Sequence, residues 1–132
     1  MCSKLEIQDL LEEIKRLIQN KSYIISTGKN RKKNEEFMFE FNLKDEEIRK
    51  LLMQIEYSDF CECLHPNDVL RNHEDYYLFA PEFTLTDLFG DVLQVIVYVK
   101  IIIKNDKENQ PFLVVVSFHR PDESKALNYQ FK

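Results

Sequence analysis

The sequence predicts an α+β fold in which N-terminal helices pack on one face of a mostly antiparallel, twisted sheet. Apolar residues recur at helical spacing in the first half of the chain, and long β-branched runs fill the second half. Helices followed by consecutive strands are typical of this layered architecture. The 2 Gly and 4 Pro among 132 residues are too few for a turn-rich β-sandwich. The length predicts a single domain over residues 1–132.

Two amphipathic helices are expected in the first half. Ser3 and Glu6 form a capping-box pattern, which predicts a helix over about residues 4–19. A second helix is marked by acidic residues in its first turn and by apolar residues at helical spacing, namely Ile48, Leu51, Leu52 and Ile55. Ser58 is expected to cap a further short helix that continues through Cys63.

The segments between these helices are less regular. "SYIIST" predicts a short strand and "GKNRKK" a basic loop. The stretch "FMFEFNL" is expected to be extended or turning, because its phenylalanines alternate as in a strand with core side chains, at Phe37, Phe39 and Phe41.

Three strands are expected in the second half. "DYYLFAPEF" predicts a strand that Pro81 ends or moves to a sheet edge. "DVLQVIVYVKIIIK" predicts one long strand, and "PFLVVVSFHR" predicts its partner across a polar loop. The polar stretch 65–74 is expected to be a loop.

The hairpin between the last two strands defines a candidate site. If Lys104 lies opposite Pro111, one face pairs only apolar residues: Val97–Phe118, Val99–Val116, Ile101–Val114 and Ile103–Phe112. That face is predicted to be core. The other face then gathers Tyr98, Lys100, Ser117 and His119, with Tyr98 opposite Ser117 and His119 diagonal to it. A half-solvated sheet face with ordinary polar residues remains an alternative.

Charge and cysteine content narrow the function classes. The net charge of −5 shows no overall basic character, although Lys29, Arg31, Lys32 and Lys33 form a local basic segment, either a binding loop or a solvated turn. Three cysteines, no apolar N-terminal signal and no apolar run of membrane length predict a cytoplasmic protein without membrane contact. Neither a metal nor a cofactor is expected; a zinc site at Cys61, Cys63, His65 and His73 is a weaker alternative, since the spacing does not match paired zinc thiols.

Four motifs in order resemble one protein family. "YSDFCEC", "DYYLF", "VYVKI" and "VVSFHRPDESKALNY" are similar to motifs of the MqsR-type toxins over about the last three quarters of the chain. The resemblance implies a RelE/ParE-like fold and a bacterial type II toxin–antitoxin system. It also implies metal-independent cleavage of mRNA, free or on the ribosome, and neutralisation by an antitoxin protein.

The resemblance also assigns residues. Tyr98 and Lys100 match the family's functional tyrosine and lysine, and His119 matches a branch that has histidine after Ser-Phe. Histidine titrates near neutrality and suits either proton role. Four more residues are expected to bind the RNA substrate: Arg120, Ser117, Lys32 and Lys33.

Two positions depart from the family pattern. Glu62 stands where a functional lysine occurs, and Glu74 stands near a functional glutamine. The sequence therefore leaves two hypotheses: a His119-centred endoribonuclease, or a non-catalytic protein-binding module of the same fold.

Overall fold

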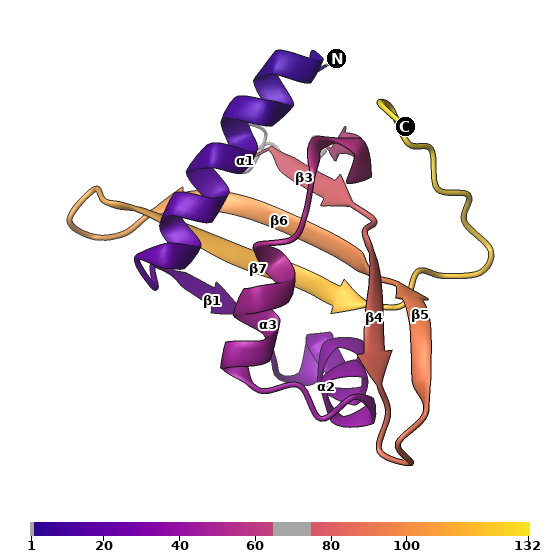
Figure 1. Cartoon of the computed structure of the whole chain (residues 1–132). Helices are drawn as coiled ribbons and strands as arrows, with labels where there is room; N and C mark the ends of the chain where they lie inside the picture. Colours follow the sequence, from indigo (N-terminus) through magenta and orange to yellow (C-terminus); the bar gives the residue numbers. More distant parts are fainter. Residues whose placement is uncertain (1, 65–74) are drawn as a thin grey trace.

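The computed structural model describes residues 2–64 and 75–132. Over these residues the chain forms three α-helices, a five-stranded sheet in the order β1-β7-β6-β3-β2, and a separate two-stranded sheet, β4-β5 (Figure 1). All neighbours in the large sheet are antiparallel except β1 and β7. The predicted α+β class with a mostly antiparallel sheet is therefore confirmed.

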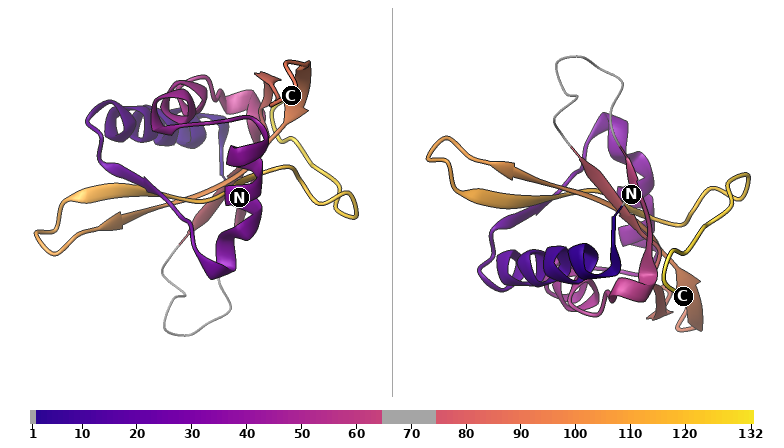
Figure 2. Two further views of the ribbon diagram at one scale, coloured as in Figure 1. Left: turned by 90° about the horizontal axis from the view of Figure 1, so that it is seen from below. Right: turned by 90° about the horizontal axis from the view of Figure 1, so that it is seen from above.

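Two helices follow the sequence pattern closely. Helix α1 (Lys4–Gln19) begins with the predicted capping box of Ser3 and Glu6 and buries one apolar face. Helix α3 (Asp45–Leu52) carries three acidic residues in its first turn, where the helix dipole favours them. Both helices lie on the same side of the large sheet (Figure 2). Their apolar faces and the sheet enclose the main core.

Helix α2 (Lys32–Glu40) corrects the expected extended segment. Phe37 and Phe41 lie four residues apart on one side of the chain and are buried, with ring centroids 5.0 Å apart. Phe39 points away from them and is 74% exposed. The alternation of phenylalanines suggested a strand, but two of the three also fit helical spacing, and packing of Phe37 against Phe118 favours the helix. A 3-10 turn, Lys29–Arg31, replaces most of the expected basic loop.

The region of the paired cysteines is a strand rather than a helix. After a 3-10 turn (Tyr57–Asp59), β2 (Phe60–Leu64) pairs with β3 (Tyr76–Phe79), and a bulge lies between Phe60 and Glu62. The bulge adds one residue to the alternation of side chains. Cys61 consequently packs with Leu78 and Ala80, whereas Cys63 packs against the main core on the other side.

The predicted long strand is divided into two. Strand β5 (Val92–Ile96) pairs with β4 (Glu82–Thr86), and β6 (Tyr98–Asn105) joins the large sheet. At the break, the Val97 amide donates to the Pro81 carbonyl at 2.9 Å. Pro81 lies between β3 and β4, and Val97 lies between β5 and β6. Strands β4 and β5 therefore leave the large sheet at the same point. The apolar composition of 92–103 gave no sign of this break.

The register of the β6–β7 hairpin differs from the prediction. Asn105, not Lys104, pairs with Pro111 at the start of β7 (Pro111–His119), so Leu113 and Val115 face the main core instead of Val114 and Val116. A bulge at Val116 then shifts the alternation, and Phe118 faces the core as expected, opposite Val99 rather than Val97.

No helix within the described residues is long and apolar enough to cross a membrane.

Candidate functional site

The bulge in β7 determines which side chains share the second face of the sheet, the face turned away from α1 and α3. Beyond it, His119 pairs directly with Tyr98, and Ser117 pairs with Lys100. Directly opposed residues of an antiparallel pair point to the same face. These four residues therefore share a face as expected, although their pairs are not the expected ones.

Tyr98 and His119 form a stacked pair. Their ring centroids are 5.4 Å apart and the ring planes are 10° from parallel. Burial raises the pKa of the Tyr98 phenol above its ordinary value, and the nearby Glu62 and Cys61 raise it further. Tyr98 is therefore a neutral phenol at pH 7 that can donate a proton or a hydrogen bond.

The backbone carbonyl of Arg120 fixes the tautomer of the His119 imidazole. Nδ1 lies 2.6 Å from the Arg120 carbonyl oxygen. A carbonyl only accepts, so in the neutral ring Nδ1 carries the hydrogen and Nε2 keeps its lone pair. Burial lowers the pKa of His119, and the positive charges of Lys33 and Arg31 lower it further, against the raising effect of the Arg120 carbonyl. The arrangement favours a neutral imidazole whose Nε2 can accept a proton.

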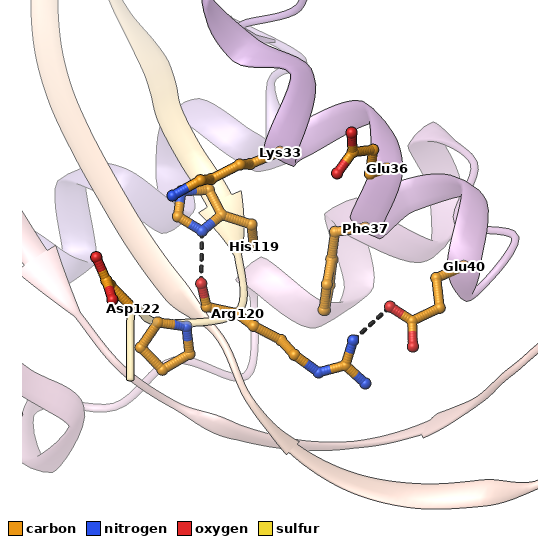
Figure 3. Close-up of a pocket in the computed structure, with 8 residues that line it drawn as sticks. Lys33, Glu36, Phe37, Glu40, His119, Arg120 and Asp122 are labelled. Carbon is orange, nitrogen blue, oxygen red and sulfur yellow. Dashed lines mark hydrogen bonds and ion pairs between the residues drawn. The ribbon is translucent and has the colours of Figure 1, made fainter. Parts of the chain in front are cut away.

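A cavity of about 320 Å³ opens beside His119 (Figure 3). It lies between α2 and the end of β7 and is lined by Lys33, Glu36, Phe37, Glu40, His119, Arg120, Pro121 and Asp122. The Lys33 side chain lines this cavity together with His119 and is drawn on the same side of it in Figure 3. One expected substrate-binding lysine is thus next to the candidate base. Lys32 is exposed at the start of α2 and is not among the residues that line this cavity.

Arg120 is held at the far side of the cavity. Its guanidinium forms an ion pair with Glu40 and lies 5.2 Å from the Phe41 ring centroid and 5.9 Å from that of Phe37. In Figure 3 it points away from the imidazole. A substrate phosphate would therefore have to compete with Glu40 for this cation.

Lys100 and Ser117 lie one residue pair further along the same face. The Lys100 ammonium is 5.0 Å from the centroid of the Tyr76 ring. Neither residue lines the cavity next to His119. The structure thus stacks Tyr98 on His119, places Lys33 and Arg120 in the cavity that His119 lines, and leaves Lys100 and Ser117 next along the same sheet face.

The sequence pattern missed the acidic and aromatic residues that α2 contributes to the site. Phe37 and Glu40 were not predicted as site residues because 37–43 was expected to be extended, and Glu36 directly precedes that segment. Helical spacing from Asn34 through Phe37 to Phe41 was the available signal. Glu74, His65 and His73 lie outside the described residues.

Among the described residues, Cys61 and Cys63 belong to no group of metal ligands. Within residues 2–64 and 75–132, no three His, Cys, Asp or Glu side chains are grouped so that they could hold an ion. Burial raises the pKa of Cys61 to about 11 and that of Cys63 to about 12, which favours thiols over the thiolates that bind metals.

Comparisons with protein-family models, with curated proteins and with solved structures give no match to this chain.

Proposed function

We propose that this protein is a metal-independent mRNA endoribonuclease with a RelE/ParE-like fold, the toxin component of a type II toxin–antitoxin system in the cytoplasm. The single observation that carries the proposal is the stacked pair of His119 and Tyr98 with Lys33 beside it. It supplies a base, a proton donor and a cation within one small region. The similarity of the four sequence motifs to the MqsR-type toxins supports the same activity.

The proposed reaction is an intramolecular transesterification. His119 Nε2 removes the proton of a ribose 2′-OH, the 2′-oxygen bonds to the adjacent phosphorus, and the bond from phosphorus to the 5′-oxygen breaks. The Tyr98 hydroxyl gives its proton to the leaving 5′-oxygen. Lys33 and Lys100 stabilise the negative charge that develops on the phosphoryl oxygens. The products are a 2′,3′-cyclic phosphate and a 5′-OH end.

Replacement of the candidate base tests this proposal. His119→Ala should lower the rate of RNA cleavage by about 100-fold or more, the usual contribution of a positioned acid or base. The products of the wild-type protein should carry cyclic phosphate ends and form equally well in a chelator. A folded H119A variant that cleaves RNA and arrests growth like the wild type would refute the assignment.

The second candidate function is a non-catalytic protein-binding module. Large apolar side chains on α2 and in the β4–β5 region are exposed, with Phe39 at 74%, Phe89 at 91% and Val92 at 64%. Leu88 is 51% exposed and its amide donates to the Glu40 carbonyl, which places the turn after β4 beside α2. Exposed apolar groups of this kind are typical of interaction surfaces. Purified protein that leaves RNA intact but binds a partner stoichiometrically, and loses the partner on Phe89→Ser, would favour this function.

A further inference from the structure

Asn34 is the single buried polar residue in the described part of the chain, and only 1% of its surface is exposed. It belongs to the first turn of α2, directly after Lys33. Its Nδ2 donates to the carbonyls of Ser26 at 2.9 Å and of Val116 at 3.0 Å. Its Oδ1 accepts from the amide of Phe118 at 2.8 Å. Both amide hydrogens and the oxygen are therefore used.

The Asn34 side chain takes the place of a strand. Strand β1 (Tyr23–Ile25) pairs with β7 only as far as Val115, and one further bond joins the Ser26 amide to the Val115 carbonyl. The next two groups on that edge of β7, the Val116 carbonyl and the Phe118 amide, bond to Asn34 instead. A carboxamide presents an N–H and a C=O as a peptide unit does, so it can continue the ladder.

These bonds fix the backbone on both sides of Ser117, at the bulge and immediately before His119. Val116 is the extra residue of the bulge, and its carbonyl is one of the two acceptors. Bulges re-aim the side chains that follow them. The same side chain thus anchors the start of α2, which carries Lys33, to the strand that carries His119.

We propose that Asn34 is a positioning residue that holds Lys33 in the cavity beside His119, so that its ammonium group faces the imidazole. The inference rests on the proposed function for its role in catalysis, although its geometry can be tested separately. With Lys33 in this position the imidazolium is disfavoured and the neutral base is retained. The charged and titratable groups that share the surroundings of His119 are Lys33, Arg31, Tyr98, Glu36, Glu40, Arg120 and Asp122.

An NMR titration of the His119 ring separates positioning from a purely structural role. Lys33→Gln should raise the titration midpoint by about half a pH unit, as expected for one ammonium group in a solvated cleft. Asn34→Ser should raise it by the same amount, because Lys33 is then released. The double variant should show no further rise. Lys107→Gln, in the turn between β6 and β7 at the far end of the hairpin, should leave the midpoint unchanged.

A folded N34S variant with an unchanged midpoint, or a double variant whose shifts add, would overturn the proposal. If N34S does not fold, the wild-type protein supplies the test. Its Asn34 side-chain amide hydrogens should exchange slowly, and a nuclear Overhauser effect should join the Lys33 side chain to the His119 ring. Absence of that effect would overturn the proposal equally.

RNA cleavage is measured on the same variants. Under the proposed function, N34S and K33Q should lower kcat and shift the acid limb of the pH–rate profile upward by the same amount. If the wild-type protein does not cleave RNA while the titrations behave as expected, the proposed function fails and the positioning role of Asn34 stands.

Discussion

The imidazole of His119 is stacked on the phenol of Tyr98 across a directly opposed pair of β6 and β7, with ring centroids 5.4 Å apart. The stack fixes the position of both rings, since each limits the rotation of the other. It also places a neutral phenol next to a nitrogen base without an ion pair between them.

Tyr98→Phe removes the hydroxyl and keeps the stack. We expect folding to be preserved and single-turnover RNA cleavage to fall by about 100-fold or more, because the leaving oxygen loses its acid. Tyr23→Phe, on β1, is the matched control and should cleave RNA normally. Full activity of the Tyr98→Phe variant would exclude the phenol as proton donor.

The lowered pKa of His119 gives stability a defined pH dependence. Above the ordinary pKa of about 6.5, the imidazole is neutral in both the folded and the unfolded chain. As the pH falls through this value, the unfolded chain binds the proton first, so the free energy of unfolding decreases. Urea denaturation at pH 7.5 and at pH 5 should show a smaller loss for His119→Asn than for the wild type. An equal loss in both proteins would contradict the lowered pKa.

The ion pair between Arg120 and Glu40 is half-exposed, with side chains 47% and 39% accessible. Such pairs stabilise a fold by about 1 kcal/mol or less. Glu40→Gln should therefore cost little stability, release Arg120 and raise the affinity for a short RNA several-fold at low salt. Fluorescence anisotropy at two salt concentrations measures the effect, with Glu108→Gln in the β6–β7 turn as control. Unchanged affinity would mean that Arg120 does not bind RNA.

Two phenylalanines of α2 should respond very differently to truncation. Phe37 is 3% exposed and packs on Phe41 and Phe118, so Phe37→Ala should destabilise the fold by about 3–5 kcal/mol. Phe39 is 74% exposed, and Phe39→Ala should change stability by about 0.5 kcal/mol or less. Chemical denaturation measures both. Similar losses for the two variants would contradict the helical placement of Phe39.

Local signals in the sequence were sufficient for α1 and α3. The capping box of Ser3 and Glu6 and the spacing of Ile48, Leu51 and Leu52 are short-range patterns that tertiary packing did not override. The segment 37–41 carries both periods, and contacts of α2 with β7, far along the chain, favour the helix: Phe37 packs on Phe118, and Asn34 bonds to the β7 backbone. Local propensity is a weak guide when two periods compete.

The candidate site was predictable in composition but not in geometry. Alternation placed Tyr98, Lys100, Ser117 and His119 on one face, and the structure agrees. The pairing depended on the bulge at Val116, where the backbone of β7 bonds to the side chain of Asn34, more than 80 residues earlier. Because no local pattern reports such a contact, neither the pairing nor the position of Lys33 could be read from the hairpin alone.

The parallel pairing of β1 with β7 has a consequence for synthesis of the protein. Residues 23–25 hydrogen-bond to residues 113–115, so the edge of the sheet forms only after nearly all of the chain described here has left the ribosome. His119 and the groups of α2 beside it meet at the same late stage. If the protein cleaves RNA, a nascent chain cannot attack the message that encodes it until residues 113–119 have left the ribosome.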